Sequence, residues 1–208
     1  MPRITAIKPQ KKINRRNIYL NGCFAFGVSV SLIAEEKLKV GDELSQEKVK
    51  ELSNKKNLEK YLDITYRYLS YRPRSVKEIT DYLRKKKISP LLIEKVLVKL
   101  KKQHYLDDLK FAYWWLDQRA RFRPRGKFAL AMELKEKGLE NDLIKSVLTE
   151  RVDEKELALK AAQKKIKSYR RFNKKEKKKK LKSFLARRGF GWPTIKVVLE
   201  TMLNEQVI

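Results

Sequence analysis

The chain of 208 residues has little of the chemistry on which most active sites depend. It contains one cysteine, Cys23, and one histidine, His104. A single cysteine excludes an internal disulfide and fits a reducing compartment, and a single histidine excludes a histidine-rich metal site. The seven glycines form neither a GxGxxG nor a GxxxxGK[ST] pattern, so no phosphate-binding loop is indicated. We expect no catalytic residue, no metal and no cofactor.

The remaining candidates for catalysis have simpler interpretations. Asp107 and Asp108 resemble a carboxylate pair, but a helix N-cap followed by an acid in the first turn explains them better. His104 lies between two predicted helices, where a histidine at the surface or at a boundary is the simpler interpretation. Cys23 is expected to be a small buried apolar residue of a strand. The sequence therefore predicts a protein that is not an enzyme.

Long hydrophobic runs are also missing, with one ambiguous stretch. Residues 17–34 carry no charge and follow Arg15-Arg16, which leaves a membrane signal-anchor as one interpretation. The stretch contains several small or polar residues, however, and its large apolar residues alternate: Phe24, Phe26, Val28, Val30 and Leu32. Alternation predicts one face of a strand, and Asn21-Gly22 is a hairpin-turn signal. We therefore expect a small antiparallel sheet in a soluble, cytoplasmic protein.

Acidic residues are too few to balance the basic ones. The chain has 52 Lys and Arg against 25 Asp and Glu, which gives a formal net charge of +27. Solubility needs a net charge of only about 2–8 in a small domain, and a larger excess destabilises the folded chain by self-repulsion. The excess favours a polyanionic partner, either nucleic acid or a nucleoprotein.

What the sequence does have is a repeat with a period of 51 residues, seen in the segments 82–97, 133–148 and 184–199. Equivalent positions hold the same residue type in all three segments, as in Leu83, Leu134 and Leu185, or Ile93, Ile144 and Ile195. Gly138 and Gly189 stand where a helix C-terminal glycine belongs, and Lys87 takes that position in the first segment. A fixed period indicates one supersecondary unit used three times. Such arrays bury a core by stacking neighbouring units and mostly present long binding surfaces.

The predicted fold is mainly helical. Ser45 is expected to cap a short helix that ends near Leu52, with a joint at residues 53–57. Beyond it we expect nine helices in three units; in the first unit Arg72-Pro73-Arg74 ends the first helix, and Ser75 and Ser89-Pro90 open the other two. The expected parts are a β-rich extension with a short helix over residues 1–55 and three-helix repeats over 56–106, 107–151 and 152–208.

Basic residues concentrate in two places. Between Lys164 and Arg188, 14 of 25 residues are Lys or Arg and Glu176 is the only acid. This density favours a surface that faces a polyanion over an ordinary solvated helix face. In the second place Phe122 stands among Arg119, Arg121, Arg123, Arg125 and Lys127. Cations that alternate with an aromatic residue can clamp a phosphate backbone or stack a base, but Phe122 is equally suited to plug a junction between helices.

Two further features of the helices bear on how the protein could bind nucleic acid. No helix pairs Asn, Gln and Arg in an obvious major-groove reading face, so phosphate contacts would give affinity without sequence specificity. Tyr113, Trp114 and Trp115 are expected to belong to the core, because helical burial of large rings needs no ligand to explain it. The residues by themselves thus predict a non-enzymatic, strongly basic helical repeat protein.

At several of these positions the chain resembles the RecX family, the regulators of the RecA recombinase. The resemblance is carried by residues 66–75 with Glu78-Ile79 and Tyr82-Leu83, by Leu106-Asp107-Asp108 with Phe111-Ala112, by residues 133–139 with Ile144, and by residues 187–190. It is strongest over residues 60–150, and residues 1–55 resemble an N-terminal extension found in some members. The lysine-dense residues 174–182 depart from the family's typical pattern.

The resemblance implies tandem three-helix units in an elongated, curved molecule that lies in the groove of the RecA–single-stranded DNA filament. There it would contact neighbouring protomers and modulate filament assembly and disassembly, RecA ATPase, recombination and co-protease activity, with a place in DNA repair and the SOS response. No cofactor is implied.

Position and charge, not a family motif, select the residues expected to contact the filament or its DNA: Arg72, Arg74, Arg119, Arg121, Arg123, Arg125, Lys127, Lys174, Lys175, Lys178, Lys179, Arg187 and Arg188. The expected partners are the RecA filament and single-stranded DNA, with duplex DNA as a further candidate, and we expect a monomer. The alternative is a general nucleic-acid-binding protein that acts through phosphate contacts without RecA.

Overall fold

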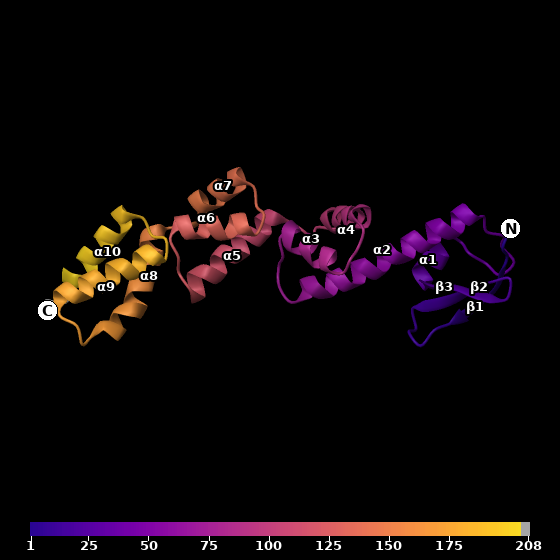
Figure 1. Cartoon of the computed structure of the whole chain (residues 1–208), viewed down its shortest axis with the longest axis horizontal. Coiled ribbons are helices and arrows are strands. Elements are labelled where there is room, and N and C mark those ends of the chain that lie inside the picture. The colour runs from indigo at the N-terminus through magenta and orange to yellow at the C-terminus, as the bar shows by residue number, and fades with distance from the viewer. Residues whose placement is uncertain (205–208) are drawn as a thin grey trace. The chain divides into compact units, whose positions relative to one another are not determined.

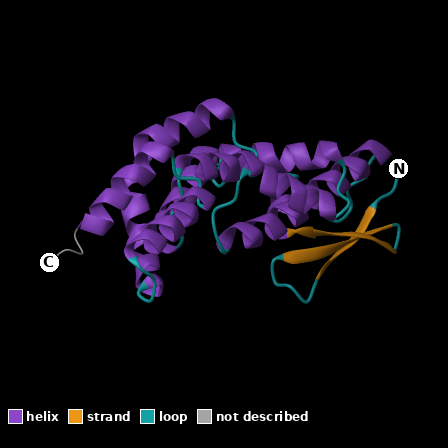
Figure 2. Cartoon of the chain, turned by 60° about the vertical axis from the view of Figure 1, so that its left-hand side comes forward, coloured by secondary structure: helices purple, strands orange, loops and turns teal. Residues whose placement is uncertain are grey.

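The computed structural model describes residues 1–204, which form two compact units. The first unit contains Met1–Tyr71 and Ser89–Leu100, and the second contains Arg72–Ile88 and the chain from Lys101 onward. Three strands come first along the chain and helices follow (Figures 1 and 2). The mainly helical fold with a small N-terminal antiparallel sheet is therefore confirmed.

A three-stranded antiparallel sheet opens the first unit, in the order β1 (Ile4–Pro9), β2 (Arg15–Leu20) and β3 (Cys23–Ser29) (Figure 2). Asn21 (φ 48°) and Gly22 (φ 83°) form the tight turn between β2 and β3 that the sequence predicted. One face of the sheet packs into a core with the helices of this unit, through Ile4, Ile18, Phe26, Val28, Leu32 and Leu52.

Details of the strand prediction are wrong. The strand ends at Ser29, whose hydroxyl accepts a hydrogen bond of 3.0 Å from the N–H of Leu32 and caps the short helix α1 (Val30–Glu35). Val30 and Leu32 are therefore helical. The pairing of β2 and β3 shifts between Ile18 and Tyr19, and this irregularity leaves Phe24 60% exposed while Phe26 is buried. Cys23, at the start of β3, is exposed instead of buried.

Ser45 caps a helix as predicted, but the helix does not stop near Leu52. The hydroxyl of Ser45 accepts a 3.1 Å hydrogen bond from the N–H of Lys48, and α2 then runs from Gln46 to Ser70 without a break. The predicted joint at residues 53–57 is wrong. No proline or glycine interrupts this stretch, and the burial of Leu52 and Leu62 holds one helical register. α4 (Pro90–Lys102) is the third helix of this unit after α1 and α2, with Ile93, Val96 and Leu100 buried.

The second unit is entirely helical in the part the structure describes. It contains α3 (Val76–Lys85), α5 (Asp108–Phe122), α6 (Lys127–Glu136), α7 (Asn141–Arg151), α8 (Glu154–Ile166), a 3₁₀ turn (Lys167–Tyr169), α9 (Lys174–Arg187) and α10 (Trp192–Asn204). One apolar core extends from Phe111 to Met202. With α2 and α4, nine α-helices follow Ser45 within residues 1–204. The sequence predicted ten there, a short helix before the joint and nine beyond it, but the two helices expected on either side of residues 53–57 are the single helix α2. The repeat boundaries at 55, 106 and 151 stay a prediction.

The 51-residue period is visible in the backbone. The second helices of the three repeats end at Lys85, Glu136 and Arg187, and each is followed by a left-handed residue: Lys87 (φ 58°), Gly138 (φ 84°) and Gly189 (φ 79°). The third helices begin at Pro90, Asn141 and Trp192, which keep the same spacing. The start of one helix, α9, departs from the 51-residue period. Since α6 begins at Lys127, the period predicts a start at residue 178, whereas a capping box of Asn173 and Glu176 starts α9 at Lys174.

Candidate nucleic-acid interface

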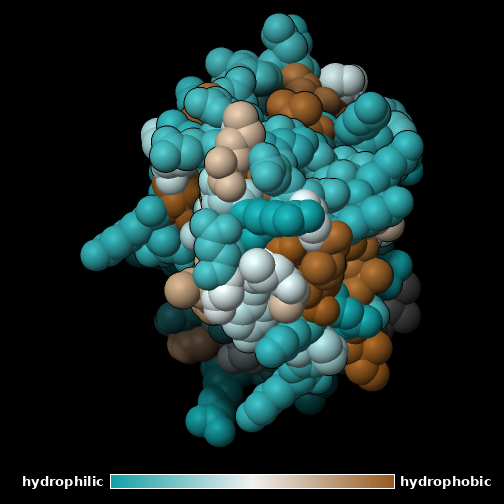
Figure 3. Space-filling view, turned by 90° about the vertical axis from the view of Figure 1, so that its right-hand side faces the viewer, coloured by the Kyte–Doolittle hydropathy of each residue, from teal (hydrophilic) through white to brown (hydrophobic). Residues whose placement is uncertain are grey.

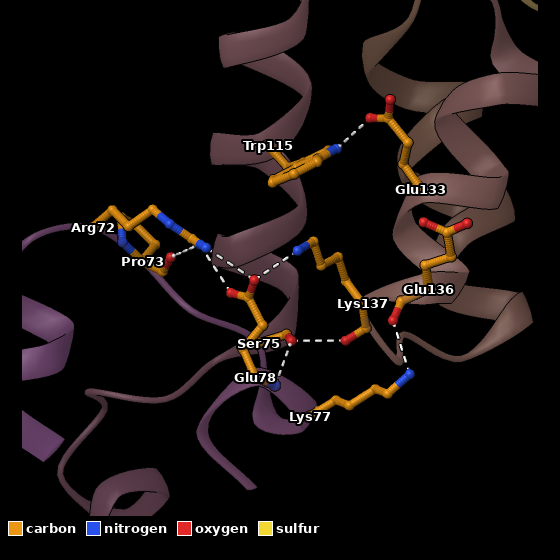
Figure 4. Close-up of polar contacts among 9 residues, drawn as sticks. All are labelled: Arg72, Pro73, Ser75, Lys77, Glu78, Trp115, Glu133, Glu136 and Lys137. Carbon is orange, nitrogen blue, oxygen red and sulfur yellow. Dashed lines mark hydrogen bonds and ion pairs between the residues drawn. The ribbon is translucent and has the colours of Figure 1, made fainter. Parts of the chain in front are cut away.

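Equivalent polar joints connect successive repeats in the second unit. In each joint, the residue before the second helix of one repeat bonds to the turn after the second helix of the next repeat. The hydroxyl of Ser75 donates to the carbonyl of Lys137 (2.7 Å), as Figure 4 shows, and the N–H of Gly126 donates to the carbonyl of Arg188 (2.9 Å). Lys137 and Arg188 are 51 residues apart, so the two bonds are the same contact made twice.

A carboxylate completes each joint. Asp108, the first residue of α5, accepts a 2.9 Å hydrogen bond from the N–H of Val76, the first residue of α3. Glu154, the first residue of α8, accepts a 2.8 Å bond from the N–H of Lys127, the first residue of α6. Each acid thus satisfies a backbone donor that the helix start leaves unpaired.

The two neighbouring acids of the second repeat have different structural tasks. Asp107 caps α5 by accepting from the N–H groups of Leu109 (2.9 Å) and Lys110 (3.1 Å), as the sequence predicted. Burial raises the pKa of Asp108, and the hydrogen bond from Val76 opposes the rise. The geometry therefore favours a cap and a joint over a catalytic pair.

Glu78 is the ionic centre of the first joint (Figure 4). Arg72 donates one hydrogen bond of 2.9 Å to each of its carboxylate oxygens, and the ammonium of Lys137 donates a third of 2.7 Å. Burial by itself raises the pKa of Glu78, but the hydrogen bonds from Arg72 and Lys137 outweigh it and hold the pKa at about 2. Arg72, predicted to contact the filament, is thereby engaged inside the protein.

Glu133 on α6 has the same role within the second repeat. It accepts hydrogen bonds from Arg119 (2.7 Å) and from the indole N–H of Trp115 (2.8 Å), and it forms an ion pair with Arg125 at 3.0 Å. The guanidinium of Arg119 also lies 4.5 Å from the centre of the Trp115 ring. Two more of the predicted contact residues therefore brace α5 and the following loop against α6.

The predicted contact residues fall into two groups. Besides Arg72, Arg119 and Arg125, Arg188 is engaged internally, since it donates a 2.9 Å hydrogen bond to the carbonyl of Pro124. Arg74 and Lys127 are half-buried. The exposed group consists of Arg121, Arg123, Lys174, Lys175, Lys178, Lys179 and Arg187. This group supplies the candidate interface of the second unit.

The aromatic residues near these cations differ in how far they are exposed to solvent. Phe122 is 75% exposed, so the interpretation that it plugs a helix junction is wrong. Tyr113, Trp114 and Trp115 pack against the core but are only partly buried. On the lysine-dense helix α9, lysine ammonium groups lie over aromatic rings: Lys180 over Phe172 at 4.1 Å and Lys182 over Trp192 at 4.4 Å.

Sequence reasoning did not identify these ring partners, nor Phe128, Tyr169 and Ser183, which border open recesses beside α9. Phe128 precedes the repeated segment by a few residues, and Tyr169 lies in a 3₁₀ turn that no periodic pattern announces. Only the basic and aromatic composition around them gave a signal.

The surface gives no sign of a metal site or a membrane span in the part described. No cluster of three or more His, Cys, Asp or Glu among the described residues is arranged to hold a metal ion. None of the helices described here is both long and apolar enough to cross a membrane. Hydrophilic side chains predominate on the face shown in Figure 3.

These features define a basic protein of three-helix repeats that follow a small antiparallel sheet. The model of the regulatory protein RecX N-terminal domain matches residues 2–45. The models of the first, second and third three-helix domains of RecX match residues 62–100, 107–148 and 153–199. The chain belongs to the RecX family of regulatory proteins, as the resemblance in the sequence suggested.

Relatives and solved structures agree with this assignment. Regulatory protein RecX of Leuconostoc mesenteroides is 32% identical over 99% of this chain and 78% of its own length. Regulatory protein RecX of Bacillus pumilus is 35% identical over 99% of this chain and 80% of its own length. A crystal structure of regulatory protein RecX superposes with a TM-score of 0.78 at 26% identity, over 95% of this chain and 98% of that one.

Proposed function

We propose that this protein regulates the RecA recombinase by binding the RecA–single-stranded DNA filament, in its groove and across neighbouring protomers. Binding there would modulate filament assembly and disassembly, RecA ATPase, recombination and co-protease activity. Membership in a family of regulatory proteins supports regulation rather than catalysis. The protein would act as a monomer in the cytoplasm and without a cofactor.

One observation carries the proposal: exposed cations recur on successive repeats that fixed polar joints connect. Arg121 and Arg123 lie on the second repeat, and Lys174, Lys175, Lys178, Lys179 and Arg187 lie on the third. The joints at Gly126 and Glu154 connect these two repeats through backbone hydrogen bonds. Cations presented in a fixed series suit a polymer that offers phosphates and acidic surfaces at regular intervals.

The test is the single-stranded-DNA-dependent ATPase rate of the cognate RecA, with this protein added at a few copies per hundred RecA. Lysozyme at moderate salt is the control for basic charge. A change at this ratio, absent with lysozyme, supports the proposal and gives the sign of the effect. No change until the protein coats the DNA would contradict it.

A charge reversal distinguishes contact with RecA from contact with DNA. Arg123→Glu changes an exposed cation of the second repeat, and Lys145→Glu makes the same change on α7 at another exposed position. We expect Arg123→Glu to weaken the effect on RecA far more than the affinity for bare DNA, and Lys145→Glu to alter both little. Equal losses on RecA and on DNA would contradict a contact with the filament protein.

The second candidate function is general nucleic-acid binding without RecA. The observation that favours it is the row of exposed lysines on α9, a feature that suits any phosphate backbone. In that case the affinity for DNA would account for every effect on RecA, and any basic protein of equal affinity would reproduce it.

A further inference from the structure

The basic helix α9 borders two open recesses, and Arg187 at its end lines both. The first recess has a volume of about 510 Å³ and lies between the second and third repeats. It is bordered by aromatic, aliphatic, cationic and acidic side chains, among them Trp115, Phe128, Met132, Arg119, Lys137, Glu133 and Glu136. The second recess, of about 500 Å³, is bordered by Tyr169, Glu176, Lys179, Lys180 and Ser183.

The second recess has the chemistry of a phosphate site. Lys179, Ser183 and Arg187 follow one another at helical spacing on one face of α9. Their side chains have no hydrogen-bond or ion-pair acceptor among the side chains that the structure describes. The one acid of the recess, Glu176, accepts a 3.2 Å hydrogen bond from the N–H of Asn173 in the capping box. Cations and hydroxyls are thus left facing the opening.

The first recess has the chemistry of a stacking surface. Phe128 is 72% exposed and Met132 is 48% exposed, although both are large apolar side chains. Four cations border the same recess, together with Glu133 and Glu136, and two of the cations, Arg119 and Lys137, are held in place by Glu133 and Glu78. An exposed aromatic ring among fixed cations is the arrangement on which bases of single-stranded nucleic acids stack.

We propose that the two recesses form one binding site for single-stranded DNA. Bases contact Phe128 and Met132 in the first recess, phosphates bind Lys179 and Ser183 in the second, and Arg187 contacts the strand where it passes between them. Each nucleotide pairs an apolar base with a charged phosphate, and the two neighbouring recesses offer surfaces for both. The inference deepens the proposed function, on which the choice of DNA as the nucleic acid rests, and it assigns the DNA contact to the second and third repeats.

The phosphate half is tested with a fluorescently labelled oligothymidylate and the full chain, without RecA, by anisotropy at several salt concentrations. We expect Lys179→Ala to weaken binding and to lower the slope of log K against log salt by about 0.7, the value for one phosphate contact with a single strand. Lys196→Ala is the matched control, because Lys196 is an exposed cation of the same repeat that borders neither recess. Equal effects of the two variants would show diffuse attraction and overturn the proposal.

The base half is tested in the same assay with Phe128→Ser. We expect the affinity to fall about five-fold or more, the loss of one stacked base, with the salt slope unchanged. Phe122→Ser is the control, since Phe122 is also highly exposed but borders neither recess. Wild-type affinity in Phe128→Ser would overturn the proposal, and so would a larger loss in Phe122→Ser.

Two comparisons distinguish this inference from simple charge attraction and from the proposed regulation of RecA. A polyglutamate of equal charge should displace the oligonucleotide poorly; equal displacement would mean that the bases contribute nothing and would overturn the proposal. If the wild-type protein regulates RecA while Lys179→Ala and Phe128→Ser bind DNA normally, the inference fails and the proposed function stands. If these variants lose DNA binding while the wild-type protein has no effect on RecA, the inference stands and the proposed function fails.

Discussion

The hydroxyl of Ser75 donates a hydrogen bond of 2.7 Å to the carbonyl of Lys137, 62 residues further along the chain. The same sequence separation joins Gly126 to Arg188, where a backbone N–H replaces the hydroxyl at 2.9 Å. Neither bond depends on the chemistry of the accepting side chain, because each acceptor is a carbonyl in the turn after a second helix. The acceptors in the two joints therefore belong to the backbone, which explains how Lys137 and Arg188 can occupy the same position in successive repeats.

The Gly126 joint leaves no room for a side chain. A Cβ at position 126 would lie 2.0 Å from the carbonyl oxygen of Gly189. We expect Gly126→Ala to lower the free energy of unfolding by about 2 kcal/mol or more, because the backbone of the next repeat must shift. Urea unfolding, monitored by circular dichroism, measures this free energy. Gly191→Ala is the control, with its nearest contact at 3.4 Å from Glu154, and losses of equal size would contradict the steric explanation.

Removing the charge of Glu78 should weaken the first joint. In Glu78→Gln the amide cannot accept charge-assisted hydrogen bonds from both Arg72 and Lys137, which now make three bonds of 2.7–2.9 Å. Both cations are partly exposed and regain water, so we expect a loss of about 1–2 kcal/mol in the free energy of unfolding. Arg84→Gln is the control, because its pair with Asp81 is long, at 3.8 Å, and exposed. A smaller loss in Glu78→Gln than in Arg84→Gln would contradict this role.

The same carboxylate gives a pH dependence of known sign. The pKa of Glu78 is about 2 in the folded protein and near 4.5 when unfolded, so its stabilising contribution is complete above pH 4.5 and is lost as the pH falls towards 2. Asp108 has a raised pKa and changes stability in the opposite direction. The difference in unfolding free energy between wild type and Glu78→Gln isolates Glu78, because Asp108 is present in both. This difference should shrink below pH 4.5, and a constant difference down to pH 3 would contradict the assignment.

Asp107 and Asp108 should respond differently to substitution. Asp107→Ala removes the N-cap of α5 and is expected to cost about 1 kcal/mol of stability. Asp108→Asn keeps an acceptor for the N–H of Val76 and removes a charge that burial disfavours, so we expect little change in stability. The proposed effect on RecA ATPase should persist in Asp108→Asn. Loss of that effect in a protein with normal stability and DNA binding would revive the catalytic interpretation of the acid pair.

The sequence predicted helix starts at Ser45, Ser75, Ser89-Pro90 and Asp107 that the structure confirms, and it also marked several helix ends. Gly138 and Gly189 mark helix ends because a left-handed residue follows the last turn, and that requirement is local. The break predicted near residues 53–57 was wrong because polar residues there are compatible with a helix, and burial of Leu52 and Leu62 decides that it continues. The exposure of Phe24 was missed because an irregular pairing between two strands sets which face it takes.

The candidate interface was predictable as a composition but not as a set of residues. Charge density identified α9 and the cluster around Arg123 as basic surfaces, because like charges accumulate only where a partner or solvent can receive them. Arg72 is equivalent to Arg123 by the 51-residue period and Arg125 lies two residues after Arg123, yet Glu78 and Glu133 engage Arg72 and Arg125 inside the protein. An acid on a neighbouring helix decides which arginine is available, and its distance in space cannot be derived from its distance in sequence.

The sequence by itself predicted the architecture: a fixed period, glycines at helix ends and an apolar stripe in each helix are local features that indicate one three-helix unit used three times. Its charge also favoured a polyanionic partner, since the net charge of +27 is a sum that folding does not change. Only the tertiary structure decided which cations are exposed, how Gly126 meets Gly189, and that Arg187 borders two recesses, one with the exposed Phe128 and Met132 and one with lysines. Those relationships join residues from different repeats, and packing brings them together through contacts that no single segment encodes.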